Sequence, residues 1–101
     1  MHAATRELSV LRVARALADP TRFRLLRAIA AQAEISCREL VARFPVSQAT
    51  VSHHLKVLAD AGLVTARQVG PYHLYRAVGG ALAAHARELE ALAGRGRGRR
   101  P

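Results

Sequence analysis

The side chains best suited to recognise another molecule lie at the start of one expected helix, residues 48–61. They carry short hydrogen-bond donors and acceptors, and a single lysine follows one turn later. Groups of this size can reach base edges in a DNA major groove about 12 Å wide, and a lysine can contact a phosphate. The candidate contact residues on and beside this helix are Ser47, Gln48, Thr50, Ser52, His53 and Lys56.

The ends and the apolar side of this helix follow from its own residues. Ser47 is a good N-cap, because its hydroxyl can accept from free backbone N–H groups, and Gly62 suits the left-handed conformation that ends many helices. Val51, Leu55 and Leu58 recur at helical spacing on one side, which predicts a buried face. An alternative is an ordinary amphipathic surface helix whose polar side is only solvated.

The neighbouring segments predict a helix, a turn, this helix and then a β-hairpin. Residues 36–44 have helical apolar spacing, and residues 45–47 form a tight link to the candidate helix. Two β-prone runs, residues 63–69 and 72–77, flank the turn pair Gly70-Pro71. A hairpin directly after a recognition helix is a wing. The candidate contact residues on this wing are Arg67 and His73.

Upstream, Asp19 precedes Pro20, which predicts an N-cap and the first position of a helix. The spacing of its apolar residues predicts a buried face formed by Phe23, Leu25, Leu26 and Ile29. Residues 30–35 are expected to be a connector with a short extended piece near residues 34–35. Residues 81–93 return to a helical pattern after a pair of glycines.

Several pieces in this order and spacing resemble the ArsR/SmtB family of winged-helix repressors. The resemblance spans roughly residues 8–92. It implies a mainly α fold with a small β-hairpin, namely a winged helix-turn-helix of about five helices and a two-stranded wing. It also implies a homodimeric repressor that binds double-stranded DNA at an inverted-repeat operator. The matching pieces are residues 17–22 (LADPTR), 47–48 (SQ), 51–55 (VSHHL), 61–64 (AGLV) and 72–76 (YHLYR).

The first and last helices carry more apolar surface than one small core requires. In the resembled family these two helices form the two-fold dimer interface, which would account for the surplus. The alternative is that both helices only close the core of a monomer. The candidate dimer-interface residues are Leu8, Leu11, Leu17, Leu82, Leu89 and Leu92.

Members of the resembled family often sense metals, but their ligand positions do not match here. The family's two thiolate positions fall on Ser36 and Arg38, and Cys37 lies between them, about 100° away around a helix. His85 and Glu88 are out of register with the family's other site, so a solvated or interface pair is expected. No metal site, cofactor or inducer is therefore predicted. The positions of that other site fall on Gly79, Ala81, Leu92 and Arg95.

Adjacent histidines on a helix diverge by about 100°, so His53 and His54 are not expected to hold one ion. In the family pattern His54 belongs to the scaffold and His53 is the exposed ring. The sequence also lacks a recognisable nucleophile, a phosphate-binding glycine loop or paired acids, so no enzyme activity is predicted. A winged-helix protein-interaction module with incidental basic charge is the alternative function.

Composition is consistent with a nucleic-acid partner. The chain has 101 residues, a net charge of +9 and a single cysteine. A bias toward arginine and alanine could produce the same charge without such a partner. The lone cysteine and the lack of a signal peptide or a long apolar run predict a cytoplasmic protein with no membrane partner. We expect one domain in residues 1–93 and a disordered Arg/Gly-rich tail in residues 94–101, which either adds phosphate contacts or is inert.

Overall fold

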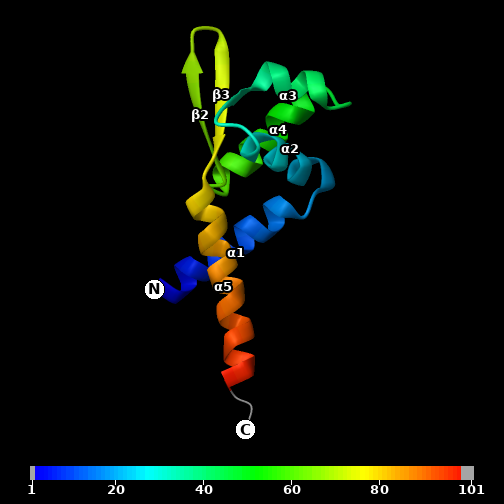
Figure 1. Cartoon of the computed structure of the whole chain (residues 1–101). Helices are drawn as coiled ribbons and strands as arrows, with labels where there is room; N and C mark the ends of the chain where they lie inside the picture. The colour runs from blue at the N-terminus through cyan, green and yellow to red at the C-terminus, as the bar shows by residue number, and fades with distance from the viewer. Residues whose placement is uncertain (1, 99–101) are drawn as a thin grey trace.

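The computed structural model describes residues 2–98, which form five helices and three strands (Figure 1). This arrangement confirms the expected winged helix-turn-helix. The β-hairpin stands at one end of the molecule and the last helix extends from the other. The elements are α1 (His2–Leu17), α2 (Pro20–Ala30), β1 (Ile35–Ser36), α3 (Cys37–Arg43), α4 (Gln48–Asp60), β2 (Val64–Val69), β3 (Tyr72–Ala77) and α5 (Gly79–Gly98).

The sheet is antiparallel, with strand order β1-β3-β2 over the described residues. Gly70 has a φ of 58° in the turn between β2 and β3, so a left-handed residue joins the two wing strands. The expected two-stranded wing needs one correction, because β1 adds a third strand at the base of the hairpin. Ile35 pairs with Tyr75 and is 3% exposed, so a burial that local sequence could not show anchors this short strand.

Local residues set the helix ends as expected. The Asp19 carboxylate accepts a hydrogen bond from the Arg22 backbone N–H at 2.9 Å, directly before α2. The Ser47 hydroxyl accepts from the Thr50 backbone N–H at 3.1 Å and caps α4. Gly62 follows α4 with a φ of 79°, a conformation that a side chain would strain.

The core lies between α2, α3, α4 and the base of the wing. The three apolar residues expected to face inward from α4 are each no more than 1% exposed, which confirms the buried face of this helix. Because that face is fixed against the core, the polar face of α4 must point outward. The buried hydrophobic residues are Val13, Ala16, Leu25, Leu26, Ile29, Ile35, Leu40, Val51, Leu55, Leu58, Leu63 and Val64.

The expectation that Phe23 is buried is wrong, because this side chain is 45% exposed. Phe23 precedes Leu25 by two residues, about 200° of helical rotation, so both cannot face the same core. The Arg27 guanidinium lies 5.7 Å from the centre of the Phe23 ring instead. The aromatic residue therefore belongs to the surface of α2.

The first and last helices form a separate, less buried part of the molecule. Leu8 and Leu11 on α1 are 56% and 52% exposed, and Leu89 and Leu92 on α5 are 49% and 60% exposed. Leu17 and Leu82, also candidates for the interface, instead pack partly against the core.

The expected end of the folded domain at residue 93 falls inside α5, which continues to Gly98. Arginine is a good helix former, and extending an existing helix fixes only one residue for each added hydrogen bond, so the alternating glycines do not stop it at once. Residues 99–101 of the expected tail lie outside the described part of the chain. Of the helices described, none combines the length and apolar character that a membrane span needs.

Candidate nucleic-acid interface

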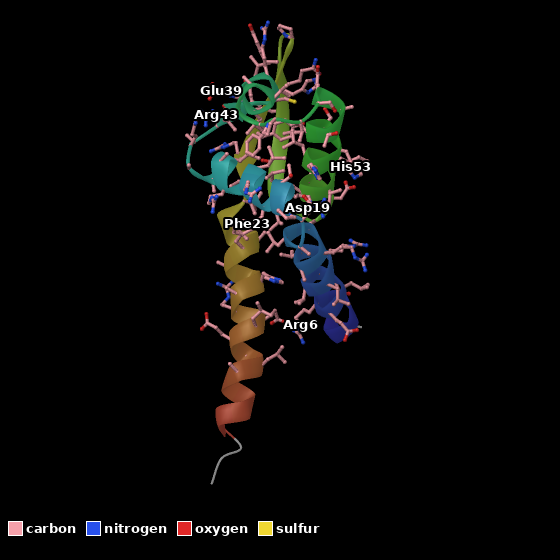
Figure 2. All side chains as sticks on the ribbon, turned by 90° about the vertical axis from the view of Figure 1, so that its right-hand side faces the viewer. Arg6, Asp19, Phe23, Glu39, Arg43 and His53 are labelled. Carbon is pink, nitrogen blue, oxygen red and sulfur yellow. The ribbon has the colours of Figure 1, made fainter. Side chains whose placement is uncertain are left out.

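One side of α4 presents a set of exposed polar side chains. Opposite them, the apolar residues of the same helix are buried, so the outward direction of this set is fixed by the core. His53 projects from α4 away from the neighbouring helices (Figure 2). The exposed residues that the sequence predicted here are Ser47, Gln48, Thr50, Ser52, His53 and Lys56.

These residues differ in how free their polar groups are. The Ser47 hydroxyl accepts from the Thr50 backbone and donates to the Thr50 hydroxyl at 3.0 Å, so it is occupied as a cap. Lys56 pairs with Asp60 at 3.1 Å, but the two side chains are 74% and 67% exposed, so this pair is weak. Gln48 and Ser52 make no side-chain hydrogen bond to any other described residue, which leaves both available to a ligand.

A cleft of about 580 Å³ lies between the helix-turn-helix and the wing. Gln48 and Ser52 line it from α4, and His73 lines it from β3. The structure therefore brings together candidates from two parts of the sequence. Arg38 on α3 also lines the cleft and is exposed, although the sequence pattern related this position only to a metal ligand. Arg38 precedes α4 on a separate helix, so sequence spacing could not show this proximity.

Arg67, the other wing candidate, is held by a carboxylate. Its guanidinium donates to Glu34 through two nitrogens, at 2.7 and 2.9 Å, and its side chain is 61% exposed. The hydrogen bonds from Arg67 lower the pKa of the Glu34 carboxyl, and the same bonds raise the pKa of Arg67. Arg67 is thus a restrained cation beside β1, and sequence reasoning did not foresee Glu34 as its partner.

A polar network holds α4 against the two helices before it. The Arg22 guanidinium donates to the Ala16 carbonyl at 2.7 Å and to His54 Nδ1 at 3.1 Å. His54 Nε2 lies 3.8 Å from the Asp19 carboxylate. Burial lowers the pKa of His54, and the hydrogen bond from the Arg22 backbone lowers the pKa of Asp19. These contacts support the assignment of His54 to the scaffold and of His53 to the exposed face.

The family's metal chemistry does not fit the described residues. Cys37 begins α3 and is half-buried, with Ser36 and Arg38 beside it in the chain where the family has thiolates. Soft metal ions need several convergent ligands, usually thiolate or imidazole. Within residues 2–98 no group of three His, Cys, Asp or Glu side chains is placed to hold an ion.

Comparison with known proteins matches residues 17–67 to a family model described as a helix-turn-helix domain. The arsenical resistance operon repressor of Staphylococcus xylosus is 38% identical over 71 residues, which cover 70% of this chain. The match spans 65% of that repressor, and for another curated relative, a SmtB homologue from Synechocystis, it spans 41%.

Solved structures resemble the whole fold. An ArsR-like transcriptional regulator from Rhodococcus sp. RHA1 superposes with a TM-score of 0.85 at 33% identity, over 92% of this chain and 87% of that one. A homodimeric winged helix-turn-helix DNA-binding domain from Mycobacterium bovis, described as a possible ArsR-family regulator, gives a TM-score of 0.73 at 27% identity. It covers 90% of this chain and 83% of that domain.

Proposed function

We propose that this chain, which belongs to the ArsR-like family of helix-turn-helix regulators, is a sequence-specific DNA-binding repressor that acts as a homodimer. The observation that carries the proposal is the exposed polar face of α4 beside the wing cleft. Gln48 and Ser52 there have unused hydrogen-bonding groups, and a buried apolar face fixes their direction.

In this proposal α4 enters the major groove and the wing follows the backbone. Gln48 and Ser52 reach base edges, with Thr50 and His53 beside them, because amide and hydroxyl groups pair with base donors and acceptors. Lys56 on α4 and Arg67 and His73 on the wing contact phosphates, which position the protein. Arg38 joins this second group, since it lines the same cleft.

The homodimer is supported by the surface of α1 and α5 and by the likeness to the Mycobacterium bovis domain, which is homodimeric. Exposed leucines at 49–60% on both helices offer the apolar area that a second copy would cover. A two-fold dimer presents two copies of α4 related by symmetry, so the operator would be an inverted repeat.

We expect zinc, cadmium and arsenite to leave DNA binding unchanged, because the donor set for a thiophilic ion is missing from the described residues. The measurement is a DNA titration of purified, reduced protein with each ion at micromolar concentration. Release from DNA that is lost in Cys37→Ser or His85→Ala would contradict this expectation and reveal a metal site.

The test of the function is selection of genomic fragments by the purified protein, followed by titration on the enriched DNA. A repressor of this kind enriches one inverted repeat. Gln48→Ala or Ser52→Ala should weaken operator binding by about 1 to 3 kcal/mol and relax preference at particular base pairs, with little change on random DNA. Gln32→Ala is the matched control, because it removes an amide from an exposed loop outside the cleft.

Two outcomes would contradict the proposal. If no shared sequence is enriched, the chain is better described as a protein-interaction module that uses the exposed leucines of α5. If removal of residues 94–101 erases sequence preference while Gln48→Ala and Ser52→Ala retain it, α4 is not the recognition helix. Otherwise that deletion should weaken binding to operator and random DNA alike.

A further inference from the structure

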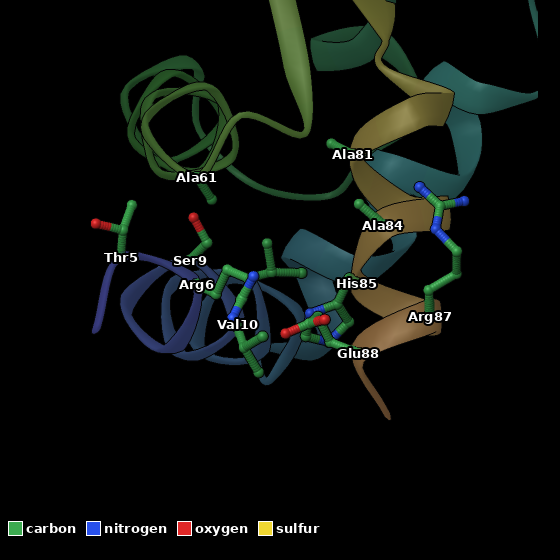
Figure 3. A pocket seen from close by; sticks show the side chains of 11 residues that line it. Thr5, Arg6, Ser9, Val10, Ala61, Ala81, Ala84, His85, Arg87 and Glu88 are labelled. Atoms are coloured by element: carbon green, nitrogen blue, oxygen red, sulfur yellow. The ribbon is translucent and has the colours of Figure 1, made fainter. Parts of the chain in front are cut away.

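A second hollow lies away from the wing, between α1 and α5, where it also reaches the end of α4 (Figure 3). Its volume is about 420 Å³, within the range of about 300–1,000 Å³ that small-molecule sites occupy. Small side chains make up most of its apolar wall, so an occupant would meet a smooth surface. The apolar lining residues are Val10, Val13, Ala61, Ala81 and Ala84.

His85 gives this cavity one unsatisfied polar atom. Its Nδ1 is buried and has no hydrogen-bond partner among the described residues. Figure 3 shows the ring pointing from α5 toward α1. A buried ring nitrogen without a partner is unfavourable, and it can either donate or accept depending on the tautomer. An occupant that hydrogen-bonds Nδ1 would remove this penalty.

The charged residues at the cavity favour an anionic group. Arg6 on α1 and Arg87 on α5 line it together with one acid, Glu88, so cations outnumber acids. Arg6 and Glu88 point into the space between the two helices (Figure 3), yet neither forms an ion pair with another residue in the described range. A metal ion fits poorly, because His85 and Glu88 do not belong to a group of three ligands among the residues that the structure describes.

We propose that this cavity binds a small organic carboxylate, with its charged end at Arg6 and His85 and its apolar body against the alanines and valines. Arginine is suited to a carboxylate because its nitrogens can donate two parallel hydrogen bonds. The neutral imidazole donates through Nδ1 in one tautomer, which completes the partners of a carboxylate oxygen.

The position of the cavity makes its occupant an effector of DNA binding, a role that rests on the proposed function. Ala61 is the C-cap residue of the recognition helix, and α1 and α5 carry the exposed leucines assigned to the dimer. A carboxylate in the cavity therefore contacts both the recognition helix and the helices that set its spacing from the second copy. Such a ligand shifts DNA affinity to the extent that it prefers one spacing.

Binding is tested first without DNA. Benzoate, phenylacetate and hexanoate are titrated into the full chain at neutral pH, with chemical-shift changes of the α1 and α5 amides as the readout. We expect at least one to saturate below about 10 mM, and benzamide, the neutral isostere of benzoate, to bind at least about tenfold more weakly than benzoate itself. If none of the three carboxylates binds in that range, the proposal is overturned.

Variants locate the site. Arg6→Gln and His85→Phe should each weaken binding of the best carboxylate by about tenfold, because each removes a contact to the carboxylate. Arg12→Gln is the matched control on α1, since Arg12 is exposed and lies outside this cavity. Ala84→Phe should abolish binding by filling the space while circular dichroism stays unchanged. Equal affinity in Arg6→Gln and Arg12→Gln overturns the site even if one of the other variants fails to fold.

The effector role is tested with DNA. The best carboxylate should change operator affinity by at least about threefold in the unmodified protein and not in Arg6→Gln. Saturable binding without any change in DNA affinity overturns the effector role. Failure of the protein to bind any DNA while the carboxylate still binds overturns the proposed function instead, so the two failures are distinguishable. Loss of carboxylate binding on dimerisation would mean that the second copy fills the cavity, which also overturns the proposal.

Discussion

The recognition helix α4 and the last helix α5 both have amphipathic sequences, but only α4 finds its apolar partner within this chain. Its Val51, Leu55 and Leu58 are at most 1% exposed. On α5, Leu89 and Leu92 are 49% and 60% exposed, and the helix extends away from the core (Figure 1). The comparison teaches that helical periodicity predicts an apolar face but not which molecule covers it. Four experiments test this difference.

The largest effect is expected from charging α5. The double variant Leu89→Glu with Leu92→Glu should raise the dimer dissociation constant at least about a hundredfold, since two buried leucines contribute roughly 3 to 6 kcal/mol. Sedimentation at micromolar protein measures the change. Ala83→Glu is the control, because it adds the same charge to an exposed position on the opposite side of α5. A double variant as dimeric as this control would show that the leucines serve another purpose.

The next effect concerns the helix whose apolar face is satisfied. Leu55→Ala should lower the free energy of unfolding by about 2 to 5 kcal/mol, because the residue is 1% exposed and its truncation leaves a cavity. Urea denaturation followed by circular dichroism gives this value. Val69→Ala removes apolar atoms from a side chain that is 43% exposed and should change stability by less than about 0.5 kcal/mol. Similar losses in both variants would contradict the assignment of the core.

A smaller effect is expected at the wing, where Glu34 restrains Arg67. Glu34→Gln removes the carboxylate and should strengthen DNA binding a few-fold, with a salt dependence steeper by about 0.9 for each phosphate gained. Arg67→Gln should change both quantities in the opposite direction. Fluorescence anisotropy across a salt series measures them. If Glu34→Gln weakens binding, the ion pair holds Arg67 in its binding position instead of competing for it.

The smallest effect is a pH dependence at the base of α4. Burial lowers the pKa of His54 in the folded chain, whereas unfolding returns it to the ordinary value of 6.5. Above pH 6.5 the ring is neutral in both states and its stabilising contribution is fully present. As the pH falls below 6.5 the unfolded state takes up the proton first, so stability declines until the pH passes the folded pKa.

His54→Phe should therefore flatten the dependence of the unfolding midpoint between about pH 7.5 and pH 5.5. Asp19, also in this network, has a lowered pKa and titrates only below its ordinary value of 3.8, so it does not contribute in that window. His53→Phe is the control, because His53 is the exposed neighbour on the same helix. A slope that His53→Phe removes and His54→Phe retains would show that the buried ring is not the source.

Much of the candidate site could be predicted because its geometry is local. An N-cap at Ser47 and a helical repeat of buried residues together fix both the start and the rotation of α4, so the outward side chains follow. The same reasoning failed at Phe23, since four apolar residues in one short helix offered more than one possible face. It also missed Arg38, whose place at the cleft depends on the angle between α3 and α4.

The sequence by itself determined the order of the elements, the helix caps, the left-handed turns at Gly62 and Gly70 and the buried side of α4. Each of these depends on residues within a turn or two of one another. Only the tertiary structure decided that Arg67 meets Glu34, 33 residues earlier, that Ile35 adds a strand beside Tyr75, and that α1 and α5 enclose a cavity around His85. These contacts join segments distant in the chain, and side-chain spacing carries no information about how the whole chain packs.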